Sequence, residues 1–265
     1  MKRLKKGLAC LLCLALLLPN VLWAVAEEPP LPIAEEGSGE SAEELLQESA
    51  DDVWLPVDTV PTEAAALEVG GKSAILMDQT SGTVLFEKNA HEKLAIASVT
   101  KIMTLLLVME ALDQGRITLE DPVTCSDVAA SMGGSQIWLE PGEIMTVHEL
   151  LKAAAVVSAN DACAALAEHI SGSIEGFVSE MNTRAAELGM NDTLFLDCSG
   201  LSDDAYSSAY DVALMSRELM KHKKITEYTT IWMDTLRDGK SQLVNTNKLV
   251  RHYSGATGLK TGTTS

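Results

Sequence analysis

The chain has 265 residues, of which 46% are hydrophobic, 22% are charged and 4% are aromatic. A chain of this length and composition can bury a large core, which excludes a small disulfide-stapled scaffold. Eighteen glycines and eight prolines without any repeated tract exclude collagen-like, low-complexity and solenoid architectures.

The net charge of -18 at pH 7 is unevenly distributed along the sequence. Residues 1–26 carry four basic side chains and no acidic ones, and residues 27–66 carry twelve acidic side chains and no basic ones, which leaves -10 for residues 67–265. An acidic domain without a basic stripe cannot neutralise phosphates, so we expect no nucleic-acid partner.

The N-terminus has the pattern of a secretory signal peptide. Four basic residues between positions 2 and 6 precede an apolar run at 8–18, and Ala-Val-Ala at 24–26 supplies the small residues of a cleavage site. The apolar run is shorter than the roughly 20 residues that span a bilayer. We therefore predict that residues 1–26 are removed and that the protein acts outside the cytoplasm, at the cell wall or the outer face of the membrane.

Residues 27–69 are predicted to be a disordered leader, because they are acidic, contain five prolines and offer few apolar side chains. The folded domain is predicted at residues 70–265. Once the signal peptide is removed, three cysteines remain, Cys125, Cys163 and Cys198. They permit at most one disulfide, and the domain does not need one.

Strand and helix patterns alternate along residues 70–265. Residues 73–78 and 83–86 are predicted to form a β-hairpin around the turn at 79–82. Residues 98–113 have apolar side chains on every face, which predicts a helix buried on all sides. Helices are also predicted at 162–170 and 174–188, and after the capping patterns at 146–149 and 208–211.

The last predicted elements are strands. Residues 230–236 and 241–244 flank an Asp-Gly turn and are predicted to form a second hairpin. A further strand is predicted to begin near Ala256. Strands at both ends of the domain around a helical block indicate an α+β fold, with an antiparallel sheet assembled from both chain ends and packed on a helical cluster.

A hydroxyl and an amine stand three residues apart at the start of the predicted buried helix, in Ser98-Val-Thr-Lys101. Residues at this spacing share one helix face, so the two side chains are expected to touch. Burial lowers the pKa of a lysine, and a neutral amine can take the proton from a serine nucleophile. Alone the motif is weak, because S-x-x-K arises about once by chance in such a chain.

Two further motifs could serve the same chemistry. Ser158-Ala-Asn160 falls between predicted helices, where a hydroxyl can relay protons and a carboxamide can hold a substrate amide, although helix capping explains these residues equally well. Lys260-Thr-Gly262 offers a fixed positive charge and a glycine that lets a substrate backbone lie close to a strand edge. A plain strand-to-turn transition is its alternative explanation.

Each motif occurs once, and the intervals from Ser98 to Ser158 and from Ser158 to Lys260 are 60 and 102 residues. In this order and spacing, residues 72–265 resemble the penicillin-binding protein and serine β-lactamase superfamily, and more closely its low-molecular-weight D-alanyl-D-alanine carboxypeptidases. The resemblance implies a β-lactamase/transpeptidase-like fold. Other stretches that are similar to the family are 96–101, 131–135, 162–171, 187–190, 245–247 and 258–262.

The resemblance implies a serine-type D-Ala-D-Ala carboxypeptidase, a hydrolase of cell wall biogenesis that acts on peptidoglycan pentapeptide stems and is inhibited by β-lactams. It implies Ser98 as nucleophile, Lys101 as base and Ser158 as proton donor to the leaving amine. It implies an oxyanion hole from two backbone N–H groups, those of Ser98 and Thr263. No cofactor or metal is expected. The implied substrate-binding residues are Asn160, Lys260, Thr261, Gly262 and Thr263.

The sequence departs from the family in two places. Residues 204–208 read Asp-Ala-Tyr-Ser-Ser where many relatives have a histidine, so no catalytic role is assigned there. The sequence also stops at Ser265, three residues after the K-T-G motif. We therefore expect the C-terminal strands to be missing and the Lys260 strand to lie at an uncovered sheet edge. Membrane association is expected only through a C-terminal segment that is absent here.

Three alternatives remain at this stage. A class A-like β-lactamase would need an activating glutamate in an E-x-x-L-N pattern, and residues 160–260 contain none. A truncated, non-catalytic penicillin-binding remnant would explain why the sequence stops so soon after the K-T-G motif. A metal enzyme is disfavoured, because His91-Glu92 begins like H-E-x-x-H but Ala95 occupies the second ligand position.

Overall fold

The computed structural model describes residues 67–264. The predicted signal peptide at 1–26 and almost all of the predicted leader at 27–69 lie outside the described residues. Among residues 67–264, no helix combines the length and the apolar character needed to cross a bilayer.

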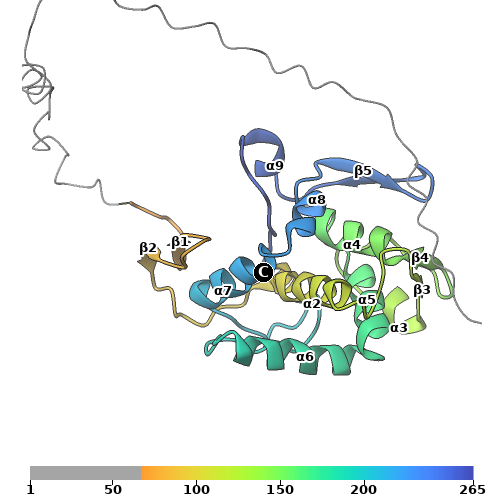
Figure 1. The fold of residues 1–265 in the computed structure, drawn as a ribbon, viewed down its shortest axis with the longest axis horizontal. Helices are drawn as coiled ribbons and strands as arrows, with labels where there is room; N and C mark the ends of the chain where they lie inside the picture. The colour runs from red at the N-terminus through yellow and green to blue at the C-terminus, as the bar shows by residue number, and fades with distance from the viewer. Residues whose placement is uncertain (1–66, 265) are drawn as a thin grey trace, which may run out of the picture. The chain divides into compact units, whose positions relative to one another are not determined.

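The predicted central helix is confirmed. A short 3-10 helix, η1 (Ala97–Thr100), leads directly into α2 (Lys101–Asp113), and ten of the thirteen residues of α2 are buried. Figure 1 shows α2 lying among four helices that each contact it: α4 (Val147–Val156), α5 (Asn160–Ser171), α6 (Ile174–Glu187) and α7 (Ala209–Leu219). Burial on all faces removes the apolar side chains of α2 from water and anchors its first turn in the core.

The helices that surround α2 are found where the sequence predicts them, although α5 begins at Asn160, two residues before its predicted start. Thr146 Oγ1 accepts a hydrogen bond from Glu149 N, and the Glu149 carboxylate accepts one from Thr146 N, which completes the predicted capping box. Ser208 caps the next predicted helix start by accepting from Asp211 N.

The remaining helices are short. Residues Thr226–Thr229 form α8, so the strand predicted from residue 230 begins three residues later than expected. The others are α3 (Asp127–Ala130), η2 (Lys223–Ile225) and α9 (Leu249–His252).

The strands form three separate antiparallel pairs among the described residues. The two predicted hairpins are confirmed, and a third pair, β3 with β4, escaped prediction because its strands are only three residues long. The pairs are β1 (Ala74–Met77) with β2 (Val84–Lys88), β3 (Pro122–Thr124) with β4 (Ile144–Thr146), and β5 (Met233–Leu236) with β6 (Ser241–Val244).

The α+β class is therefore confirmed, but two details of the prediction are wrong for the described residues. The strands of the two chain ends are not joined in one sheet. Residues 256–264 form no ladder, so the strand predicted near Ala256 is not present. A ladder needs a partner strand, and this segment is held by side chains instead: Thr229 Oγ1 donates to Thr257 O, and Asn247 Nδ2 donates to Gly258 O.

The three cysteines of the described domain, Cys125, Cys163 and Cys198, are all buried free thiols. The domain is thus held together without a disulfide, as the sequence allows. Cys163 lies on α5, one turn after its first residue.

Candidate active site

The first turn of the buried helix brings a hydroxyl and an amine together. The Nζ atom of Lys101 lies 3.1 Å from Oγ of Ser98, so the contact expected from their three-residue spacing is present. The same Nζ donates to the carbonyl of Ser199 at 2.6 Å. Lys101 is completely buried, and it is one of the largest fully buried side chains of the described domain.

The surroundings of Lys101 favour its neutral form. Burial lowers the pKa of the amine, because an ammonium ion loses its hydration in the protein interior. The carboxylate of Asp197 acts in the opposite direction and favours the ammonium form. A buried amine with a lowered pKa in contact with a serine hydroxyl can act as the base that deprotonates it.

The S-x-N motif lies at the junction of α4 and α5. Ser158 has a positive φ of 64°, and its Oγ atom is buried without a hydrogen-bond partner in the described structure. Asn160 begins α5, and its Oδ1 atom is likewise buried and unpartnered. Helix capping does not explain these residues, because Ala159 is the N-cap of α5 and no side chain caps this helix.

Asn160 is held by the loop that precedes β4. Its Nδ2 atom donates to Gly133 O at 2.7 Å, and its backbone N donates to Ser135 O at 2.7 Å. Gly134 leaves space for the amide, since a β-carbon there would lie 2.7 Å from Asn160 Nδ2. The oxygen of the carboxamide is thereby left free for another donor.

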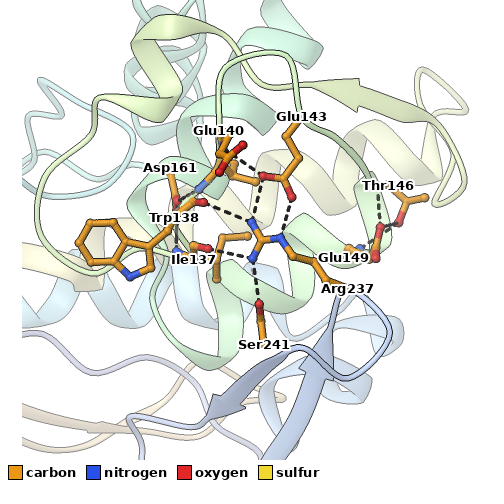
Figure 2. A network of polar contacts seen from close by, with 10 residues as sticks. Ile137, Trp138, Glu140, Glu143, Thr146, Glu149, Asp161, Arg237 and Ser241 are labelled. Atoms are coloured by element: carbon orange, nitrogen blue, oxygen red, sulfur yellow. Dashed lines mark hydrogen bonds and ion pairs between the residues drawn. The ribbon is translucent and has the colours of Figure 1, made fainter.

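Figure 2 shows how the following part of this loop is fixed. The buried Asp161 carboxylate accepts from the backbone N–H groups of Ile137 and Leu139, at 3.1 and 3.0 Å. From the turn between β5 and β6, Arg237 donates to Ile137 O and forms an ion pair with Glu143. That pairing lowers the pKa of Glu143. These contacts hold the loop against the start of α5, and therefore against Asn160.

The K-T-G segment lies against η1. A β-carbon at Gly262 would lie 2.8 Å from the carbonyl oxygen of Ile96, so only glycine permits this approach. Thr261 Oγ1 donates to Thr246 Oγ1 at 2.8 Å, which ties the segment to the residues after β6. The structure therefore brings the K-T-G motif to the turn that contains Ser98.

Burial lowers the pKa of Lys260 to about 8, and Lys101 acts in the same direction when it is protonated. Its Nζ atom donates to Thr261 O at 2.7 Å. Lys260 therefore carries its positive charge at neutral pH and loses it in mildly alkaline solution.

A hollow of about 450 Å³ lies beside η1. Its walls come from η1, from the loop after Cys198 and from the end of the K-T-G segment. The lining residues include Ala97, Gly200, Leu201 and Thr263. The hollow thus borders both the turn that carries Ser98 and the end of the K-T-G segment.

Several residues that build this site were not predicted from the sequence: Gly133, Ser135, Asp161, Asp197 and Ser199. The stretch 131–135 was noted only as a resemblance to the family. Asp197 precedes a Ser-Gly pair by two residues, a pattern typical of a turn closed by an aspartate side chain, and it could have been found from that signal. Among residues 67–264, no three His, Cys, Asp or Glu side chains are grouped to hold a metal ion.

Comparison with known proteins identifies the family. The family model described as peptidase S11, D-alanyl-D-alanine carboxypeptidase, matches residues 59–265. The chain is 55% identical over 197 residues to the D-alanyl-D-alanine carboxypeptidase DacF of Bacillus subtilis, covering 73% of this chain and 51% of that protein. It is 39% identical over 207 residues to DacC of Escherichia coli, with 75% and 52% coverage. The chain thus spans about half the length of these relatives.

Solved structures agree with the α+β, transpeptidase-like fold. Penicillin-binding protein 6B of Escherichia coli has a TM-score of 0.72 at 34% identity, over 77% of this chain and 66% of that one. Penicillin-binding protein D2 of Listeria monocytogenes, solved in its ampicillin-bound form, has a TM-score of 0.67 at 31% identity, over 75% and 81%. Together with the geometry around Ser98, these matches show that the chain belongs to the D-alanyl-D-alanine carboxypeptidase family, the low-molecular-weight penicillin-binding serine peptidases.

Proposed function

We propose that residues 70–265 form the catalytic domain of a serine-type D-alanyl-D-alanine carboxypeptidase, which removes the terminal D-alanine from peptidoglycan pentapeptide stems. The observation that carries this proposal is the contact between the buried Lys101 amine and the Ser98 hydroxyl. The names of the relatives DacF and DacC, which are D-alanyl-D-alanine carboxypeptidases, support it.

Acylation begins when the neutral Lys101 amine takes the proton of Ser98. The Ser98 oxygen attacks the carbonyl of the D-Ala-D-Ala peptide bond and forms a tetrahedral intermediate. The backbone N–H groups of Ser98 and Thr263 are assigned to its oxyanion, and loss of one such donor costs about 3 to 4 kcal/mol in comparable sites. When the intermediate collapses, the C–N bond breaks and an ester to Ser98 remains.

The leaving amine must receive a proton, and Ser158 is assigned to deliver it. Its buried hydroxyl lacks a partner in the described structure, and such a group is costly unless a ligand pairs with it. The same argument assigns Asn160 Oδ1 to a substrate N–H. Lys260 is assigned to the terminal carboxylate, with Thr261, Gly262 and Thr263 lining the peptide. Water then hydrolyses the ester.

β-Lactams are proposed to acylate Ser98 as well, because their strained amide presents a carbonyl and a carboxylate in the same arrangement as the substrate. The ampicillin-bound form of the Listeria relative supports this. We also propose that residues 1–26 are a signal peptide, that residues 27–69 are a leader, and that the protein acts at the cell wall outside the cytoplasm. Its N-terminal charge pattern supports export.

The test is release of D-alanine from a pentapeptide stem, measured with an enzymatic D-alanine assay. The wild-type protein should release one D-alanine per peptide, and Ser98→Ala should release none at equal folded concentration. A tetrapeptide stem, which lacks the terminal residue, serves as the substrate control. Equal release by the wild type and Ser98→Ala, or no release by the wild type, would refute the proposal.

A further inference from the structure

The loop at residues 197–202 packs against the first turn of α2, although it lies almost a hundred residues away in sequence. Its Ser199 carbonyl accepts from Lys101 Nζ at 2.6 Å, and its Cys198 carbonyl accepts from Thr104 Oγ1 at 2.6 Å. Two consecutive carbonyl groups thus face one side of the helix. The loop therefore holds the proposed base through its backbone carbonyls, and its residues Gly200, Leu201 and Ser202 also line the hollow beside η1.

One carboxylate shapes this loop. Asp197 Oδ1 accepts from the backbone N–H of Ser199 at 2.7 Å and of Gly200 at 2.5 Å, and it also accepts from Ser199 Oγ. Asp197 Oδ2 accepts from the N–H of Ser202 at 2.7 Å. Burial alone would raise the pKa of Asp197, but these N–H donors outweigh burial and lower the pKa. The carboxylate is therefore charged and bonded on both oxygens.

The folded loop fixes the nucleophile's turn as well as the base. Gly200 has a φ of 83°, and a β-carbon on it would lie 1.8 Å from Ala97 O and 3.0 Å from Ser98 N. The backbones of Gly200 and Ala97 are thus in direct contact. Any loosening of residues 198–202 would release both the Ser199 carbonyl and the backbone beside Ser98.

The Ser199 carbonyl also determines how the amine of Lys101 is oriented. A neutral amine has two N–H donors and one lone pair, whereas a carbonyl oxygen can only accept. When one N–H is donated to Ser199 O, the lone pair is free to face the hydroxyl of Ser98, where the proton must be taken up. Proton transfer is sensitive to such orientation, and a misplacement of about 1 Å can cost about 100-fold in rate.

We propose that Asp197 is a positioning residue, which folds residues 198–202 into the turn that places the Ser199 carbonyl on Lys101 and Gly200 on Ala97. Asp197 itself is assigned no contact with substrate or with the reacting atoms. This inference rests on the proposed function, since it assigns to Asp197 the orientation of the proposed base. Its negative charge has a second effect, because it favours the ammonium form of Lys101.

The experiment compares Asp197→Ala and Asp197→Asn with a matched control, Asp204→Asn. Asp204 is an exposed carboxylate a few residues along the same segment. Its substitution removes the same charge without removing the loop's hydrogen bonds. Two quantities are measured across pH at equal folded concentration: the rate constant for acylation of Ser98 by a fluorescent penicillin, and the titration of the Lys101 ε-methylene by carbon-13 NMR.

We expect the maximal acylation rate to fall by about 100-fold in Asp197→Ala. A smaller loss of about 10-fold is expected in Asp197→Asn, because a carboxamide keeps one acceptor oxygen but presents an N–H donor to the backbone of the loop. In Asp197→Asn the Lys101 titration and the acidic limb of the acylation profile should both move to lower pH. Asp204→Asn should match the wild type in both measurements. A purely structural role would reduce the folded fraction without moving these curves.

Wild-type rates and an unchanged Lys101 titration in folded Asp197→Asn would overturn the inference, as would equal effects in Asp204→Asn. Failure of the proposed function looks different, because the wild-type protein itself would then remain unlabelled by penicillin. The NMR titration still decides the role of Asp197 in that case. If Asp197→Ala does not fold, Asp197→Asn supplies the answer.

Discussion

Gly200 and Ala97 touch through their backbones: a β-carbon on Gly200 would lie 1.8 Å from the carbonyl oxygen of Ala97. The atoms that such a β-carbon would meet belong to the backbone of Ala97 and Ser98, so they cannot move aside as the end of a flexible side chain would. The contact joins the loop beside Lys101 to the turn that carries Ser98. It therefore offers a direct test of how rigidly the site must be built.

Gly200→Ala should lower the free energy of unfolding by about 3 kcal/mol, at the upper end of ordinary single substitutions, and should abolish acylation by penicillin. Gly189→Ala is the matched control. Gly189 also has a positive φ, of 74°, but a β-carbon there meets nothing within 4 Å. Gly189→Ala should lower the free energy of unfolding by only about 1 kcal/mol and leave acylation unchanged. Urea unfolding gives the free energy of unfolding of both variants. Equal losses of stability in the two would contradict the importance of the contact between Gly200 and Ala97.

Penicillin should form an ester with Ser98 and with no other residue. The reason is that Ser98 is the hydroxyl that the buried Lys101 amine contacts. Mass spectrometry of digested, labelled protein should place the adduct on the peptide that contains Ser98. Heat-denatured protein controls for non-specific labelling. If folded Ser98→Ala retained the label, another nucleophile would have to be sought.

Lys101→Arg should lower the rate of acylation by about 1000-fold, within the range that general-base catalysis supplies. A guanidinium stays protonated at any working pH and cannot take the proton from Ser98. Stopped-flow measurement with a fluorescent penicillin tests this, with circular dichroism as the check that the larger side chain is accommodated. Wild-type kinetics in this variant would transfer the role of base to another group, first of all Ser158.

The affinity for a substrate with a free carboxylate should fall as pH rises through about 8, because that is where buried Lys260 loses its proton. Below this pH the ammonium can attract the carboxylate, and above it the neutral amine cannot. In Lys260→Arg the charge persists, so KM for the pentapeptide should stay constant from pH 7 to 9.5. KM values that rise equally in both proteins would show that another group titrates.

Local sequence patterns predicted the parts of the site that depend on neighbours in the chain. The contact between Ser98 and Lys101 follows from their spacing at a helix start, and the capping box at Thr146 follows from hydrogen bonds within four residues. The loop at 197–202 reaches Lys101 only through tertiary packing. The local pattern around Asp197 indicates a turn, but no periodicity or spacing shows that this turn packs on Lys101 or that the Ser199 carbonyl contacts the amine.

The strand predicted near Ala256 fails for a related reason. The K-T-G motif was expected on an extended segment, and Gly262 does lie beside η1, as expected of a site residue. Whether an extended segment joins a ladder depends on a partner strand elsewhere in the chain. In this segment the carbonyl groups of Thr257 and Gly258 accept hydrogen bonds from the side chains of Thr229 and Asn247 instead. The two partners lie 28 and 11 residues apart in sequence, so local patterns do not reveal these bonds.

If the protein is exported as proposed, its buried thiols impose an order of events on folding. Burial raises the pKa of Cys163 to about 11 and raises that of Cys198 further, so in the folded domain both are shielded from oxidants by access and by protonation. An unfolded chain has no such protection, since its thiols are ordinary and free to form wrong disulfides. In an oxidising compartment the domain would therefore have to fold before its cysteines are cross-linked, and burial would then keep the thiols reduced.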